Sequence, residues 1–370
     1  MKKNIKYLLL NLIFCQLSWY NHPELEWQTI ETEHFKVHFH QNTERSAREA
    51  AYIAEYIYAH VTALYDFEPD SKTEIIIKDI HDYSNGSAYY YNNQIEIWAK
   101  PLDYDLRGSH RWLQDVITHE FTHIIQLGKS MKYSRFLPGG YIQKIGYEEE
   151  KRYDVLYGYP NQISSYTIPG AAVPPWFAEG TAQYMYDKAY FDFWDSIRDM
   201  LLRDRVLNNN LLSFNEMNTF GKCGTGNELV YNQGFSLVNY IVDTYGEEAL
   251  KHISISLSKP FNYSIDRALK DAIGINGQTL YHDWSLQLNN QYSIKLEEVK
   301  NIEENTYNDK YFDILAGNGT TNLNPCWSPN SKKIAFISNQ DNDFFSSTDL
   351  FIIDDDSTSK VVSGVKSKPT

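Results

Sequence analysis

The sequence predicts an α+β fold, and three observations lead to this prediction. Patterns typical of strand, helix, strands and helix follow one another up to residue 129. Helical periodicity prevails from residue 175 to residue 290, and short strand patterns replace it beyond residue 300. We therefore expect a layered unit with a mixed sheet, then a helical subdomain, and then a partial all-β segment.

The layered unit is expected to hold three strands and two helices. The strands are placed where apolar residues alternate with polar ones or form a short buried run: 34–40, 72–80 and 94–99. The helices are placed where apolar residues recur at helical spacing: 43–66 and 109–127. Asp82 to Gly86 has the composition of a turn, and Gly128 with Lys129 is expected to close the second helix.

The middle of the chain divides into a long excursion and a helical region. Residues 131–175 are rich in Gly, Pro and Tyr, which predicts a loop with little regular structure that forms a lid or wall of a cleft. Pro175 is a favoured first residue of a helix, and Gly246 is a favoured cap at a helix end. The expected helices are 175–186, 192–206, 228–245 and 262–290.

The composition limits the classes of function. The net charge of the 370 residues is −14, which argues against a nucleic-acid binder, because such proteins usually carry a basic face. Three cysteines are present, Cys15, Cys223 and Cys326. They lie far apart, and their spacing indicates neither a disulfide framework nor a cysteine metal site.

The N-terminal residues 1–18 are expected to form a signal peptide. Lys2, Lys3 and Lys6 accompany the apolar run from Tyr7 to Leu17, which is too short to span a bilayer comfortably. An uncleaved anchor is the alternative. No later segment reaches transmembrane length. We therefore expect an exported bacterial protein that is periplasmic, secreted or associated with the outer membrane.

A candidate metal site lies on the second helix, in His119-Glu120-Phe121-Thr122-His123. Residues four apart lie about one helical turn from each other, so both imidazoles share a face and can hold one ion. Nitrogen donors favour Zn²⁺, and a catalytic zinc site keeps one position for water. Glu120 is then the expected general base toward the metal-activated water. The alternative is a pair of polar core histidines with a salt-bridging glutamate.

Such a site requires a third protein ligand. Gln126 and Lys129 stand where one class of these enzymes has Gly and His, which excludes that class. Glu179 is the preferred candidate, because a carboxylate in an otherwise apolar helix start is costly unless it is paired or binds a metal. Gly180 and Ala182 beside it would permit close helix packing. The other candidates are His110, His252 and His282.

Four further polar residues receive structural interpretations. His34, His38 and His40 lie on one alternating strand, so they are expected to be structural or surface residues. Asp115 precedes His119 by one turn and could orient an imidazole. A solvated helix face is the expectation for Asp115.

The motif residues resemble the gluzincin metallopeptidases of the peptidase-MA-like branch. The matching residues are His119-Glu120-x-x-His123, then Trp176-Phe177-x-Glu179-Gly180-x-Ala182, then Tyr231-Asn-Gln-Gly234-Phe235. The resemblance covers residues 24–290 and implies a zincin-like fold, one zinc ion on His119, His123 and Glu179, and a peptide or protein substrate. It also implies that the Tyr231 hydroxyl stabilises the oxyanion. A core tyrosine is the alternative for Tyr231. The gap 124–178 is longer than in the aminopeptidase-type members.

The C-terminal end carries a second resemblance. Strands are expected at 332–338 and 349–353, with a turn at Asn339 to Asp343. Residues 324–337 and 349–354 resemble one repeat of the TolB-like β-propellers. One blade cannot bury its faces alone, so we expect either that the natural chain continues or that the tail borrows a partner. A protein partner on the propeller is implied in the same way.

These observations divide the chain into a signal peptide (1–18), a zincin-like metallopeptidase domain (24–290), a linker (291–308) and an incomplete propeller repeat (309–370). The expected function is an exported zinc metallopeptidase. One alternative is a catalytically silent, zinc-stabilised domain that presents a propeller for protein binding. Another is an exported zinc hydrolase that cleaves other bonds. Intact Glu120 and Tyr231 favour an enzyme, because a structural zinc site needs neither.

Overall fold

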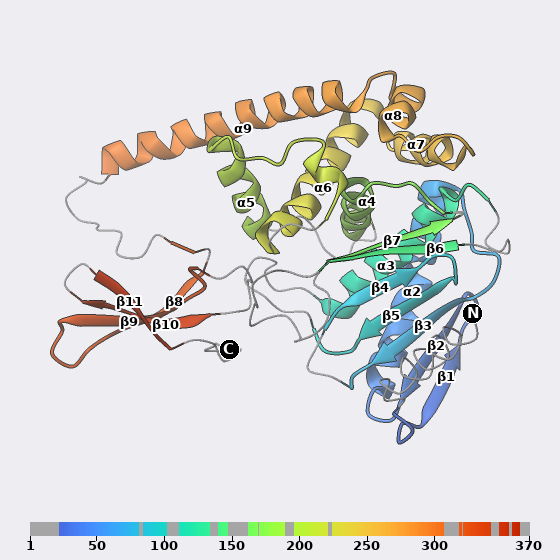
Figure 1. Cartoon of the computed structure of the whole chain (residues 1–370), viewed down its shortest axis with the longest axis horizontal. Helices are drawn as coiled ribbons and strands as arrows, with labels where there is room; N and C mark the ends of the chain where they lie inside the picture. Colours follow the sequence, from blue (N-terminus) through green and yellow to red (C-terminus); the bar gives the residue numbers. More distant parts are fainter. Residues whose placement is uncertain are drawn as a thin grey trace, which may run out of the picture.

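A computed structural model shows a layered sheet-and-helix unit, a group of helices and a separate small sheet (Figure 1). The expected signal peptide, Cys223 and His110 lie outside the residues that the structure describes. Those residues are 22–80, 84–101, 111–133, 140–146, 162–168, 170–188, 196–220, 224–306, 318–319, 321–341, 348–354 and 357–362.

The layered unit contains a mixed sheet of five strands. In spatial order they are β1 (Trp27–Glu31), β2 (Phe35–His40), β3 (Thr73–Lys78), β5 (Gln94–Trp98) and β4 (Gly86–Tyr89). The three central strands β2, β3 and β5 run parallel, and the edge strands β1 and β4 run antiparallel to their neighbours. The mixed sheet and its three central strands agree with the sequence-based prediction, while β1 and β4 were not predicted.

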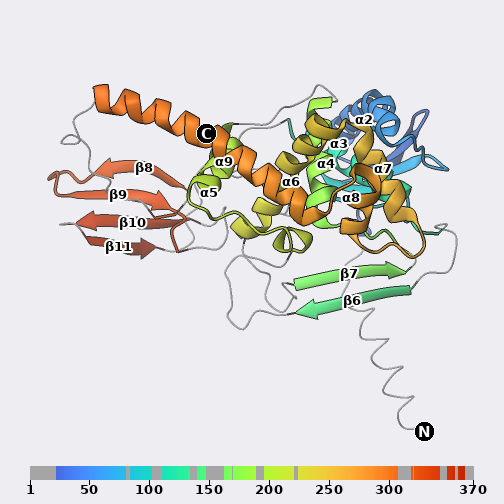
Figure 2. The same cartoon turned by 90° about the horizontal axis from the view of Figure 1, so that it is seen from above.

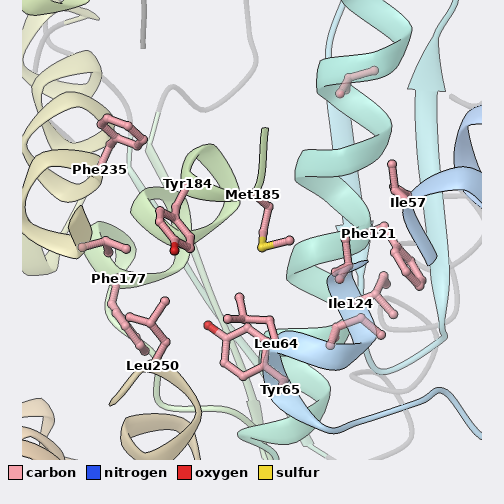
Figure 3. Packing of buried hydrophobic residues seen from close by; sticks show 14 of the residues in the cluster. Ile57, Leu64, Tyr65, Phe121, Ile124, Phe177, Tyr184, Met185, Phe235 and Leu250 are labelled. Carbon is pink, nitrogen blue, oxygen red and sulfur yellow. The ribbon is translucent and has the colours of Figure 1, made fainter. Parts of the chain in front are cut away.

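One face of this sheet is covered by α2 (Glu44–Tyr65) and α3 (Trp112–Lys129). Alternate residues of the central strands point toward these helices and are fully buried: Phe35, Val37, Ile75, Ile77, Ile95 and Ile97. Figure 3 shows Phe121 and Ile124 of α3 beside Ile57 of α2, within the same apolar cluster. Each such side chain contributes roughly 1.5–3 kcal/mol by its removal from water. The helix that carries the histidine motif is therefore fixed against the core.

The end of α3 differs from the prediction. The helix continues through Gly128 and Lys129, and the Ser130 amide still bonds to the Gln126 carbonyl. A Cβ atom at Gly128 would lie 2.7 Å from the Phe67 ring. Gly128 therefore allows a close contact with the Phe67 ring, whereas the sequence alone presented this glycine as a helix stop.

The excursion 131–175 contains regular structure. Strands β6 (Gly140–Gly146) and β7 (Gln162–Ile168) pair antiparallel as a two-stranded sheet, with Gly140 opposite Ile168 (Figure 2). The prediction of little regular structure is wrong for these residues, because polar and small residues among them concealed the strand pattern.

The helical region contains α4 (Pro175–Lys188), α5 (Ser196–Leu207), α6 (Gly224–Tyr245), α7 (Glu248–Ser258), α8 (Ile265–Ile273) and α9 (Gly277–Thr306). Pro175 begins α4 and Gly246 follows α6 with a positive φ, as predicted. The single helix predicted at 262–290 is wrong, because Gly274 at φ +82° ends α8. Helix α9 then continues to Thr306 and takes up most of the expected linker.

The C-terminal part forms an open antiparallel sheet, which we term the tail sheet. Its strands are β8 (Asn322–Trp327), β9 (Lys333–Ser338), β10 (Asp349–Asp354) and β11 (Ser357–Val362). Phe336 and Phe351 stack at 5.8 Å between ring centroids. The described residues of the tail show this one sheet and no closed propeller.

None of the described helices combines the length and the apolar composition that crossing a membrane requires.

Candidate metal centre

The described residues contain one cluster that could hold a metal ion, made of His119, His123 and Glu179. The two histidines lie on one face of α3, and Glu179 lies on the first turns of α4. The Glu179 Oε2 atom is 2.9 Å from His119 Nε2 and 3.3 Å from His123 Nε2. The structure therefore brings together the three residues that the sequence offered as candidate ligands.

The geometry of the cluster fits a small tetrahedral cation. Ligand atoms bound to one tetrahedral zinc ion at about 2.0–2.1 Å lie roughly 3.3 Å from each other. The candidate donor atoms all lie within 4.8 Å of one another, which is close enough for them to share one ion. Two imidazole nitrogens and one carboxylate oxygen are a donor set of catalytic zinc sites.

The helices α3 and α4 meet at this point because buried contacts join them. The Gln126 side chain, one turn after His123, donates from Nε2 to the Phe177 carbonyl at 3.2 Å and to Thr181 Oγ1 at 3.2 Å. Phe177 itself is fully buried. These contacts place the start of α4, and with it Glu179, opposite the two histidines.

Burial and charge act together at the ligands. His119 and His123 are 9% and 8% exposed. Burial opposes ionisation of Glu179, but the charge of His123 and hydrogen bonds with both histidines outweigh it and hold the pKa of Glu179 well below its usual value. Burial lowers the pKa of His123, whereas the Glu179 charge beside it raises that pKa, with a net increase. The carboxylate is thus kept as an anion, the form that binds a cation.

Glu120 occupies the position between the two histidines on the motif helix. It is 7% exposed, and its Oε1 atom would lie 2.7 Å from a Cβ atom added to Gly86. Strand β4 therefore passes directly over the Glu120 carboxylate. The sequence placed Gly86 at the end of a predicted turn, and no strand was predicted there, so this close approach could not be detected from the sequence.

Tyr231 also lies at the cluster. Its ring is 6.2 Å from the ring of His119 between centroids and is nearly parallel to it. Phe220 lies on Tyr231 at 5.8 Å between ring centroids. The side chain of Tyr231 is half-buried. Helix α6 thus supplies a third element to the site.

The other candidates that the structure describes do not join the cluster. His252 and His282 are exposed. His34 pairs with Glu55 at 2.7 Å, and His38 contacts Thr29 at 2.9 Å, in line with the structural interpretation of the strand histidines.

Asp115 is only 6% exposed, so the interpretation as a solvated helix face is wrong.

Comparison with known proteins extends this picture. The sequence model of the Peptidase MA superfamily matches residues 160–290. This match supports a peptidase-type function. A solved structure of an aminopeptidase N family protein from Idiomarina loihiensis is similar at a TM-score of 0.31 and 9% identity. The alignment covers 91% of this chain and 66% of that one. No curated protein matches the chain in sequence.

The matched range includes Glu179 and Tyr231 but begins after the histidine motif, which lies upstream of residue 160. The contact between His119 and Glu179 therefore joins the histidine motif to the region that the superfamily's sequence model matches.

Proposed function

We propose that the chain is a zinc-dependent metallopeptidase of the gluzincin type. The observation that carries the proposal is the convergence of His119, His123 and Glu179 from two helices, with Glu120 buried beside them. The match to the Peptidase MA superfamily supports the same reaction class. A bound zinc ion would polarise the scissile carbonyl and acidify a water molecule at neutral pH.

The protein groups divide the proton transfers between them. Glu120 accepts the proton of the attacking water and later returns it to the leaving amine. The Glu120 carboxylate suits this role because β4 covers it and shields it from bulk solvent. The Tyr231 hydroxyl donates a hydrogen bond to the oxygen on which negative charge develops. His119, His123 and Glu179 act only as ligands.

The decisive experiment compares zinc content with hydrolysis. The purified protein is incubated with a quenched fluorescent peptide library, with and without a zinc chelator. Glu120→Gln should keep one zinc ion per chain and lose about 10²–10⁴-fold in kcat. His119→Ala should lose both zinc and activity. Full hydrolysis by Glu120→Gln would exclude the proposed mechanism.

The same measurements separate the alternatives. A protein that binds zinc and cleaves no peptide would be either a silent zinc-stabilised domain or a hydrolase of other bonds. Ester and glycoside substrates distinguish these two cases. Among these alternatives, the match to the Peptidase MA superfamily supports the peptidase.

We further propose that the chain is exported through its N-terminal residues 1–18 and that the tail sheet is one blade of a propeller that binds a protein. The basic and apolar leader supports export. The four antiparallel strands of the tail sheet support its assignment as a blade. Trp327 on β8 is 63% exposed, which supports contact with a protein partner. Fractionation of the producing cells tests export. Binding assays that compare the full chain with a variant lacking the tail sheet test whether the blade binds a protein.

A further inference from the structure

Helices α4 and α6 pack on each other more extensively than any other pair of described elements. Two glycines lie at the crossing. A Cβ atom added to Gly180 would lie 2.4 Å from the carbonyl carbon and oxygen of Gly234. A Cβ atom added to Gly234 would lie 2.4 Å from the carbonyl oxygen of Trp176. The two helices are therefore in backbone contact, which only glycine permits at these positions.

This crossing joins two parts of the candidate site. Gly180 follows the ligand Glu179 directly on α4. Gly234 lies three residues after Tyr231 on α6, which is nearly one helical turn and on the same side of the helix. The separation of the two helix axes at the glycines therefore sets how far Tyr231 lies from the ligands.

The surrounding contacts leave little room for adjustment on the α4 side. Trp176 is fully buried, and its indole Nε1 donates to Asn218 Oδ1 at 3.1 Å. The next residue, Phe177, is held through its carbonyl by Gln126 of α3. Because the obstacle to a methyl group is backbone rather than side chain, no rotamer change removes it. Helix α6 must then move relative to α4.

We propose that Gly234, with Gly180 as its counterpart, is a positioning residue that holds Tyr231 at the metal ligands. The proposal rests on the proposed function. A methyl group at Gly234 needs a shift of about 1 Å to reach ordinary van der Waals distance from the Trp176 carbonyl. A displacement of this size at a reacting centre reduces the rate about 10²-fold. The ligands stay in place, because Glu179 is on the helix that α3 holds.

The first test is Gly234→Ala in the zinc-loaded protein. We expect one zinc ion per chain, a loss of about 10²-fold in kcat and a much smaller change in KM. Leu237→Ala is the matched control, because Leu237 is fully buried on the same helix and its truncation destabilises the core without inserting a methyl group. The control should keep kcat within a few-fold. Wild-type kcat in Gly234→Ala would overturn the proposal.

A double-mutant cycle tests whether Gly234 acts through Tyr231. In the Tyr231→Phe background, Gly234→Ala should lower kcat by less than about 3-fold, because the hydroxyl that it displaces is already gone. If Gly234→Ala lowers kcat as much in the Tyr231→Phe background as in the wild type, the loss belongs to another group and the proposal is overturned.

A binding measurement provides a readout apart from turnover. A phosphonate peptide carries the tetrahedral, charged group that Tyr231 would contact, so calorimetry should show the same loss of affinity in Gly234→Ala and Tyr231→Phe. An unchanged affinity in Gly234→Ala would count against the proposal.

Gly180→Ala places the methyl group on the opposite helix of the same crossing and should show the same separation of zinc content from kcat. If neither glycine variant reaches a zinc-binding state that unfolds cooperatively, the glycines serve folding alone and the proposal is overturned. A wild-type protein without chelator-sensitive hydrolysis would instead remove the proposed function on which the inference rests.

Discussion

Glu179 is the anionic member of the candidate centre, and the fold keeps its side chain 13% exposed between two histidines. An isolated carboxylate in such surroundings would be strongly disfavoured. Its pKa is nevertheless held low, because the contacts with His119 and His123 outweigh the effect of burial. The same contacts keep Glu179 in the anionic form that the proposed ligand role requires.

Replacement of Glu179 by Gln should weaken zinc binding more than about 100-fold. Removing a group that only orients a ligand lowers metal affinity by at most about that factor. The amide keeps the shape but loses the negative charge. Competition with a chromophoric chelator measures the affinity. Glu247→Gln is the control, because that carboxylate accepts from Tyr184 on the opposite part of α4 and is no ligand. Equal affinities of Glu179→Gln and wild type would exclude Glu179 from the ligands.

Lys132 is a second residue whose role the structure reveals. It is 7% exposed and donates from Nζ to the carbonyls of Leu257, Lys259 and Asn262. Burial lowers the pKa of Lys132. The ammonium group thus binds the carbonyls at and after the end of α7 and joins that helix to the end of α3. Its sequence context shows no such function.

We expect Lys132→Met to lower the free energy of unfolding by about 2–4 kcal/mol, because buried carbonyls lose a charged donor. Urea denaturation followed by circular dichroism measures the change. Lys129→Met is the matched control, since the half-buried Lys129 donates to one carbonyl among the described residues, that of Asp66. The control should change stability by less than about 1 kcal/mol. A similar effect in both variants would contradict the assigned role.

Among the elements of the fold, the contact between β4 and α3 governs the space around Glu120, the proposed general base. Strand β4 is one of the two edge strands of the sheet, and it begins at Gly86. A Cβ atom at Gly86 would lie 2.4 Å from Val116 Cγ2 and 2.7 Å from Glu120 Oε1. The strand can approach the motif helix this closely only because the residue is glycine.

Gly86→Ala should therefore reduce kcat about 10- to 100-fold by displacing the Glu120 carboxylate, with zinc content unchanged. Steady-state kinetics and metal analysis check this. Adding Val116→Ala removes the contact with Val116 but leaves the one with Glu120, so the double variant should regain stability and not activity. Recovery of full activity would show that Glu120 is not displaced.

The predicted elements were most accurate where burial shapes the sequence. Helix α2 and strands β3 and β5 have regular apolar patterns because one face of each lies in the core. Strand β1 is mostly exposed and β4 has no alternation of burial, so neither produced a detectable pattern. Helix α7 was missed, and α8 was merged with α9.

At the scale of the whole molecule, the candidate centre and the tail sheet are separate. The centre depends on α3, α4 and α6, whereas no extensive packing joins the tail sheet to these elements among the described residues (Figures 1 and 2). A ligand stabilises only the unit in which its binding groups lie.

Zinc removal should therefore destabilise one part of the chain. At free zinc 1,000 times above Kd, the layered unit and its helices should gain about 4 kcal/mol. In calorimetry, chelation should lower the temperature of one unfolding transition and leave that of the tail sheet unchanged. His119→Ala should remove the response to zinc. A shift of every transition would show that the units unfold together.

Sequence alone indicated the candidate groups: a pair of histidines one turn apart with a glutamate between them, and an acidic third candidate in an apolar helix start. Such inferences rest on local spacing, which a helix fixes without help from the rest of the chain. Tertiary structure decided which partners meet. It placed Glu179 on the histidines across 60 residues, brought Gly86 over Glu120, and set α6 against α4 through Gly180 and Gly234. Those contacts depend on how whole elements pack, and neighbouring residues in the sequence do not specify them.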